Sequence, residues 1–297
     1  MKCGHLKKVK TWIFLFLLCV CVITITKVSS DIRKNEMDFV KSISVLQWYN
    51  YTEGKHLNGP KILMNDPRLV TRLQQNFLIP PPEPFSKHPY HLTKPELTDT
   101  SMGQAEKVKQ ILKYKKNGFF VECGAMDGET RSNTLYFERY LNWTGLLIEA
   151  DPLNFGEMML KNRRAWLSPT CLSKTQYPTI VSFKQQYNQG KISDETVGST
   201  KPDHVDVQCF PFYTYMLAMN ITNVDYFSLD VEGDELDVLK TIPFHIINIE
   251  TLSVEFIHVK EGRDSISEFM KSKGYRIDSE VTHPNWLAND YIFVKNR

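Results

Sequence analysis

The segment Glu122-Cys123-Gly124-Ala125-Met126-Asp127-Gly128 decides the fold of this chain. It follows an apolar run at residues 118–121 that is typical of a buried strand, and it precedes a helix-compatible stretch at 134–141. Glycines in a strand–turn–helix unit allow a sharp turn and leave no Cβ between the main chain and a ligand. The segment therefore predicts a nucleotide-type ligand, although Met126 replaces the middle glycine of the phosphate-binding G-x-G-x-x-G pattern.

Acidic residues follow two further predicted strands. A strand at residues 145–148 ends in Glu149 and Asp151, and a later strand ends in Asp230 and Glu232. Ligands of an open α/β sheet bind at the carboxyl ends of its strands, so these acids are candidate ligand contacts. Glu149 is placed to accept hydrogen bonds from ribose hydroxyls, whereas Asp230 and Glu232 could orient an acceptor hydroxyl or a cofactor amino group. The alternative is that these acids are solvated or cap the following helices.

The chain after residue 100 alternates predicted strands and helices, which is typical of an α/β protein. Strands are expected near 119–123, 145–149, 166–172, 180–184, 224–230, 247–256, 274–277 and 290–295. Helices are expected near 104–116, 132–141, 153–162, 212–219, 234–241 and 264–272. Residues 187–206 are polar and aperiodic, and they are expected to form a mobile loop over the ligand edge or a surface insertion.

Three motifs resemble the FkbM-type S-adenosylmethionine-dependent methyltransferase domain. They are Val121–Ala125 with Gly128, Ile148–Pro152, and Ser228–Gly233, and the stretches at 253–256, 273–275 and 289–294 also fit the family. The resemblance covers roughly the last two thirds of the chain. It implies a Rossmann-like class I methyltransferase fold, in which a mostly parallel sheet has helices on both faces.

The resemblance also implies the cofactor and the residues that bind it. The cofactor would be S-adenosylmethionine. The cofactor-binding residues would be Glu122, Gly124, Ala125, Gly128, Glu149 and Asp151. Asp230 and Glu232 would be the catalytic residues.

Within the family, the Glu-Cys-Gly-Ala-x-Asp-Gly-Glu variant and the stretch at 161–173 resemble the insect Star proteins. Star proteins are single-pass membrane proteins with this domain on the lumenal side. The resemblance implies a role in vesicle-mediated transport of membrane-protein clients from the endoplasmic reticulum through the Golgi and endosomes, with the plasma membrane as a further location. An active lumenal O-methyltransferase that acts on a glycan or lipid hydroxyl is the alternative, and the two functions are compatible.

An apolar, uncharged run at residues 11–26 is expected to be a transmembrane signal anchor. A cleaved signal peptide is the alternative, because the small residues at 28–30 suit cleavage. The basic residues before the run place the tail at 1–10 in the cytosol and the rest of the chain in the lumen. A proline-rich stem is expected at 27–100 and the methyltransferase-like domain at 101–297.

Cysteines and sequons agree with a lumenal domain. Cys171 and Cys209 form the plausible disulfide of an oxidising compartment, although both could be buried small side chains, and Cys123 is expected to be a free thiol. Three N-glycosylation sequons begin at Asn50, Asn142 and Asn220.

Several other functions are disfavoured. A net charge of +2 without basic runs that interleave with aromatic residues argues against nucleic-acid binding. No C-x-x-C or H-x-x-x-H spacing occurs, so no metal is expected. A Golgi glycosyltransferase would share the tail, anchor and stem, but its Asp-x-Asp motif is absent. His258 could act as a base, although an exposed loop histidine is the simpler interpretation.

Overall fold

The computed structural model describes residues 54–284 and 288–296, within a compact unit that runs from Tyr51 to Arg297. The predicted anchor at 11–26 and the sequon at Asn50 lie outside the described residues. In the described ranges, no helix combines the length and the apolar character needed to cross a membrane.

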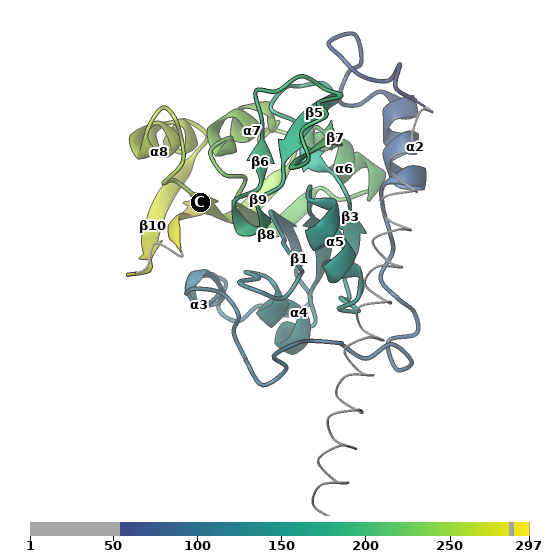
Figure 1. Ribbon diagram of the computed structural model, residues 1–297. Coiled ribbons are helices and arrows are strands. Elements are labelled where there is room, and N and C mark those ends of the chain that lie inside the picture. The colour runs from purple at the N-terminus through teal and green to yellow at the C-terminus, as the bar shows by residue number, and fades with distance from the viewer. Residues whose placement is uncertain (1–53, 285–287, 297) are drawn as a thin grey trace, which may run out of the picture. The chain divides into compact units, whose positions relative to one another are not determined.

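A seven-stranded sheet forms the centre of the domain (Figure 1). Its strands are β1 (Phe119–Cys123), β2 (Thr144–Ile148), β3 (Trp166–Ser168), β8 (Asn223–Leu229), β9 (Asn248–Glu255), β10 (Tyr275–Thr282) and β11 (Asn289–Lys295). They lie in the order β10-β11-β9-β8-β1-β2-β3, and the strands from β9 to β3 are parallel, whereas β11 pairs antiparallel with both β9 and β10. The predicted Rossmann-like α/β fold with a mostly parallel sheet is therefore confirmed.

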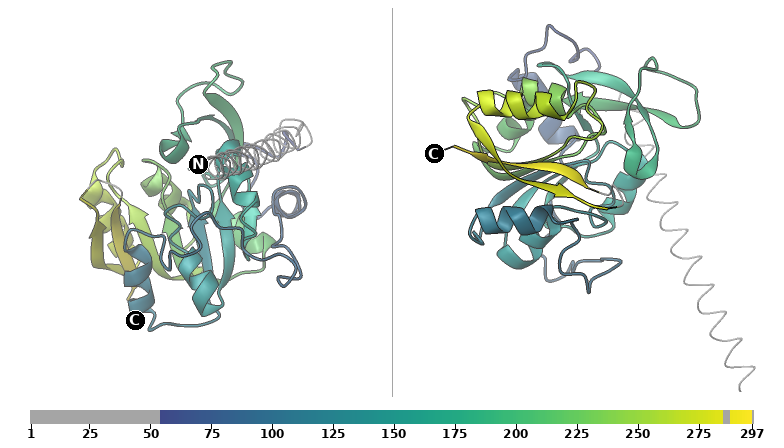
Figure 2. Two further views of the ribbon diagram at one scale, coloured as in Figure 1. Left: turned by 60° about the horizontal axis from the view of Figure 1, so that its bottom comes forward. Right: turned by 90° about the vertical axis from the view of Figure 1, so that its left-hand side faces the viewer.

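Helices cover both faces of this sheet, as Figure 2 shows. They are α2 (Pro67–Asn76), α3 (Gln104–Ile111), α4 (Leu135–Leu141), α5 (Pro152–Met159), α6 (Phe212–Ala218), α7 (Glu235–Thr241) and α8 (Arg263–Ser272). Helices α3 and α4 lie on one face, and α7 and α8 lie on the other. The helix expected to reach Lys116 ends at Ile111, and Lys113 and Tyr114 beyond it adopt left-handed φ angles of 52° and 56°.

A second, four-stranded sheet was not predicted. It consists of β4 (Cys171–Leu172), β5 (Thr179–Lys184), β6 (Lys191–Ile192) and β7 (His204–Phe210), in the order β4-β7-β5-β6. The single strand predicted at 166–172 is wrong, because the chain leaves the large sheet after Ser168 and joins the second sheet at Cys171. The expected loop at 187–206 instead contains a 3₁₀ turn at Tyr187–Gln189, β6 and the start of β7.

The proline-rich segment before residue 101 packs onto the domain. Asp66 caps α2 by accepting a hydrogen bond from the backbone N–H of Arg68 at 2.9 Å, as its sequence predicts. Leu69 and Leu73 of this helix are fully buried in the main hydrophobic core, and α2 contacts α6. The boundary expected at residue 101 therefore falls inside a packed unit, because the prolines stiffen this segment without holding it away from the domain.

The two central strands approach each other most closely at Gly124, just after β1. Its φ angle is +81°, and a Cβ built there would lie 2.0 Å from the carbonyl oxygen of Asp230. The backbone N–H of Asp230 in turn donates to the carbonyl of Cys123 at 3.1 Å. Only glycine allows this contact, which joins the ends of β1 and β8.

We expect Gly124→Ala to destabilise the domain by at least about 3 kcal/mol, because it combines a left-handed φ with a backbone clash. Gly198→Ala is the matched control, since Gly198 has a φ of +85° but no atom within 4 Å of an added Cβ. The control should cost only about 1 kcal/mol. Chemical denaturation measures both, and equal losses would show that backbone conformation rather than the close approach matters.

Candidate active site

A cavity opens at the carboxyl ends of β1, β2 and β8, where the strand order of the large sheet reverses. Open α/β sheets bind ligands at such a switch point. The predicted site residues that line it are Glu122, Gly124, Ala125, Glu149, Asp230 and Glu232. Gly128 and Asp151 are not among its lining residues. The strand ends thus bring most of the predicted site together.

Glu149 directly follows β2 and has an exposed fraction of 5%. One carboxylate oxygen accepts the backbone N–H of Met126 at 2.7 Å, and the other accepts that of Asp151 at 2.8 Å. Each carboxylate oxygen has two lone pairs, so the two backbone N–H groups leave acceptor capacity on the carboxylate, which the side chain of Asn154 shares. Burial raises the pKa of Glu149 to about 8, despite these hydrogen-bond donors. The acceptor capacity that remains suits a hydroxyl group of a ligand.

Glu122 has far less capacity for a ligand, although it lines the cavity. Its Oε1 accepts the backbone N–H of Asn133 at 2.7 Å, and its Oε2 accepts the hydroxyls of Ser132 at 2.8 Å and Thr134 at 2.5 Å. Both lone pairs of Oε2 are therefore used within the protein. Glu122 mainly orders the loop that leads into α4.

Gly128 and Asp151 lie outside the lining of the cavity and contribute to the structure around it. At Gly128 φ is +75°, and an added Cβ would lie 2.8 Å from Cγ of Met158. Asp151 is the N-cap of α5, where its side chain accepts the backbone N–H of Leu153 at 2.8 Å. It also accepts a hydrogen bond from Gln185 of the second sheet at 2.8 Å. Both residues act through packing and capping in this structure.

Five carboxylates gather at the ends of β8 and β9 and on β11 and α7. They are Asp230, Glu232, Glu235, Glu255 and Asp290. Burial raises the pKa of Asp230 to about 6, and burial followed by repulsion from Asp230 raises that of Glu232 to about 7. The same two causes raise the pKa of Glu255 to about 11. Asp230 and Glu232 therefore change protonation state near neutral pH, which suits proton transfer.

His258 joins this group from the loop after β9. Its Nδ1 lies 3.0 Å from Oε2 of Glu232 and 3.0 Å from Oε2 of Glu255. Burial, followed by the nearby Lys191, lowers the pKa of the imidazole. Sequence analysis considered His258 as a base but did not connect it with Glu232, because only the pairing of β8 with β9 brings the loops after these two strands together.

The segment at 187–192 covers one side of the cavity, which matches one of the two interpretations of the polar stretch at 187–206. Asn154 of α5 anchors it by donating to the carbonyl of Tyr187 at 3.0 Å. On another side, Gln104 at the start of α3 lines the cavity and donates to Asp290 at 2.8 Å. No local motif marks either wall, so sequence reasoning could not assign Gln104 or Asp290.

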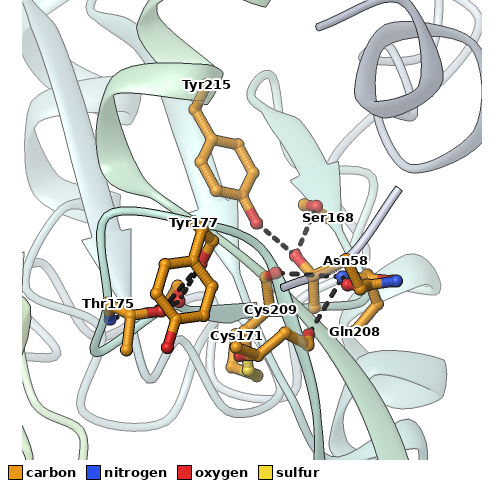
Figure 3. The surroundings of a disulfide bond; sticks show 11 residues. Asn58, Ser168, Cys171, Thr175, Tyr177, Gln208, Cys209 and Tyr215 are labelled. Atoms are coloured by element: carbon orange, nitrogen blue, oxygen red, sulfur yellow. Dashed lines mark hydrogen bonds between the residues drawn. A yellow bond between two sulfur atoms is a disulfide. The ribbon is translucent and has the colours of Figure 1, made fainter. Parts of the chain in front are cut away.

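A disulfide borders the cavity (Figure 3). Cys171 and Cys209, the expected pair, are linked at paired positions of β4 and β7, and Cys171 lines the cavity. Beside them, Gln208 donates to the side-chain oxygen of Asn58 at 2.8 Å. Cys123 is a buried free thiol whose pKa is raised by burial. The disulfide therefore links β4 and β7 within the second sheet, at a position where that sheet lines the cavity.

The model of the Methyltransferase FkbM domain family matches residues 122–277. The chain belongs to this family. The match covers more than half of the sequence and includes all of the predicted catalytic and cofactor-binding residues. Its methyltransferase assignment supports S-adenosylmethionine as the cofactor, and the acceptor capacity of Glu149 at the carboxyl end of β2 fits that group.

Solved methyltransferases resemble the chain at low identity. A putative O-methyltransferase from Klebsiella pneumoniae is 10% identical with a TM-score of 0.40, covering 78% of this chain and 91% of its own. A putative RNA methyltransferase from Pyrococcus horikoshii is 11% identical with a TM-score of 0.37, covering 77% and 98%. TrmK of M. capricolum, solved with S-adenosyl-homocysteine, is 12% identical with a TM-score of 0.35, covering 64% and 68%. No curated protein matches the chain.

We expect Glu149→Gln to stabilise the ligand-free protein increasingly, relative to wild type, as the pH rises from about 5 to about 8. The pKa of Glu149 rises from 4.5 to about 8 on folding, so the folded state holds the proton over this window. Wild-type stability therefore falls with rising pH, by at most about 1.4 kcal/mol per pH unit, and levels off above the folded-state pKa. Gln does not titrate, so urea unfolding of both proteins across this window isolates the effect; a constant difference would contradict the assignment.

Proposed function

We propose that the domain binds S-adenosylmethionine and transfers its methyl group to a hydroxyl of a glycan or lipid. The observation that carries this proposal is the geometry of Glu149, whose carboxylate is oriented by two backbone N–H groups at the carboxyl end of β2 and keeps acceptor capacity toward the cavity that it lines. An acid at this position of a nucleotide-binding sheet accepts hydrogen bonds from ribose hydroxyls. The cavity continues from Glu149 to Asp230 and Glu232, so cofactor and acid groups share one space.

Methyl transfer demands little of the protein beyond positioning and a base. The acceptor oxygen forms a bond to the methyl carbon while the carbon–sulfur bond breaks, and S-adenosylhomocysteine leaves as a neutral thioether. The hydroxyl proton must pass to a nearby group. Asp230 and Glu232 line the cavity with pKa values raised to about 6 and about 7, close to the value that favours a general base near neutral pH.

The protein is proposed to cross the membrane once, with a short cytosolic tail and with the domain in the lumen. Asn142 and Asn220 are both exposed, so their sequons are accessible to glycosylation. The Cys171–Cys209 disulfide suits an oxidising compartment. The basic residues before the apolar run at 11–26 support the same orientation.

A role in the export of membrane-protein clients from the endoplasmic reticulum through the Golgi and endosomes is the second candidate. It is supported by the resemblance to the Star proteins and by the apolar segment that would anchor a lumenal domain. A fold can keep its cofactor pocket and serve another duty, so this role does not require methyl transfer.

We expect Glu149→Ala to weaken S-adenosylmethionine binding by about 2–3 kcal/mol, because two hydrogen bonds to a carboxylate are lost. Isothermal titration of the purified protein measures the change, and Glu157→Ala on α5, whose side chain is outside the lining of the cavity, is the control. Melting curves show whether each variant is folded. A folded wild-type protein that takes up no cofactor at millimolar concentration would refute the enzyme proposal.

The same variant separates the two candidate functions. If export depends on the protein's surface alone, cells that carry only Glu149→Ala should deliver the client to its destination as wild-type cells do. A loss as large as in cells without the protein, at normal variant abundance, would show that export needs the pocket.

Glycosidase treatment of the expressed protein should increase its gel mobility. Asn142→Gln and Asn220→Gln should each remove one step of that shift, whereas Asn65→Gln, at an exposed asparagine outside any sequon, should not. Unchanged mobility, together with protease access to residues 54–296 in sealed microsomes, would contradict a lumenal domain.

A further inference from the structure

Two carboxylates and an imidazole converge in the cavity at the ends of β8 and β9. The ligand atoms of Glu232, Glu255 and His258 all lie within 4.8 Å of one another. Glu232 follows β8, Glu255 ends β9, and His258 lies in the loop after β9. Among the described residues, the ion pairs of both carboxylates are with His258. Sequence analysis expected no metal because no spacing motif is present, but these ligands come from two separate segments.

A buried polar group in the same cavity provides an independent observation. Asn133 lines the cavity with an exposed fraction of 8%, and its Oδ1 has no hydrogen-bond partner. Its Nδ2 donates to the hydroxyl of Ser228 at 2.9 Å, two residues before Asp230 on the chain. Ser228 pairs with Ser253 across β8 and β9, two residues before Glu255. The cavity that the acids line therefore also holds a buried oxygen that a ligand could satisfy.

We propose that Glu232, Glu255 and His258 bind one divalent cation of the Mn²⁺ or Mg²⁺ class at the acceptor end of the cavity. Carboxylate oxygens suit Mg²⁺ and Mn²⁺, and the imidazole nitrogen favours the transition metal. The ligands come from two segments that the parallel pairing of β8 with β9 holds together. This pairing fixes the positions of the ligands relative to one another.

Charge supports the same conclusion. Asp230, Glu232 and Glu255 all line the cavity, and His258 pairs with two of them. A bound dication would be the largest local charge there and would favour the ionised carboxylates.

The role of the cation rests on the proposed function, but the site does not. As a Lewis acid, the cation would bind the acceptor hydroxyl and make its proton easier to remove. Asp230, which lines the cavity beside these ligands, would remain available to take that proton. The cation would thus orient an acceptor oxygen toward the methyl group.

Binding of Mn²⁺ to the full-length, detergent-solubilised protein tests the site without knowledge of the acceptor. Electron paramagnetic resonance of free Mn²⁺ should show one saturable site per chain, and added Mg²⁺ should compete. The bound ion should show coupling to a histidine nitrogen. Protein treated with a chelator should still bind S-adenosylmethionine, so a failure of this proposal is distinguishable from a failure of the proposed function.

Three variants give the test its specificity. His258→Gln and Glu232→Gln should each weaken Mn²⁺ binding at least tenfold, and His258→Gln should abolish the nitrogen coupling. Asp237→Asn on α7, a half-exposed acid whose ion pair is with Lys240, should leave binding unchanged. His258 is half-exposed, so its replacement should not unfold the domain. A wild-type protein without saturable Mn²⁺ binding, or equal affinity in the His258→Gln protein, would overturn the proposal.

Discussion

The candidate site depends on one buried cation, the guanidinium of Arg163. Arg163 and Glu138 form an ion pair at 3.0 Å, and the side chains of both are fully buried. The guanidinium also donates to the carbonyl of Gly128 and to the hydroxyls of Ser132 and Thr134. Because those hydroxyls bind Glu122, one cation fixes the glycine turn, the start of α4 and the end of β1 together. Removing one partner of such a pair leaves an uncompensated buried charge, which destabilises a protein by about 3–5 kcal/mol.

This arrangement also explains what the stretch at 161–166 does in the fold. Lys161 pairs with Glu129 at 2.7 Å, and Glu129 in turn accepts backbone N–H groups of Thr93 and Lys94. Arg164 lies over the rings of Phe85 and Tyr90, at 4.9 Å and 4.7 Å from their centroids. The stretch therefore holds the proline-rich segment against the domain.

The strand ends could be predicted from sequence because the relevant signals are local. An apolar run, a glycine turn and a following acid occur within a few residues, so β1, β2 and β8 and the acids Glu149, Asp230 and Glu232 were all found. Features that depend on pairing could not be found. The break between β3 and β4 and the approach of His258 to Glu232 both follow from which strands are neighbours. Motif matching also cannot distinguish a residue that contacts the ligand from one that acts only through packing or helix capping, as Gly128 and Asp151 show.

The acidic group at the ends of β8 and β9 bears on whether the domain retains a ligand-dependent function. Gathering Asp230, Glu232 and Glu255 in a partly buried position opposes folding, because loss of solvent and mutual repulsion both disfavour their charged forms. A domain that served only as a scaffold would gain stability from neutral side chains at these positions. The close approach of Gly124 to Asp230 fixes the position of these carboxylates relative to the cofactor end of the cavity. Functional sites are where proteins keep such destabilising arrangements, so the retained acids favour a cavity that still binds ligands.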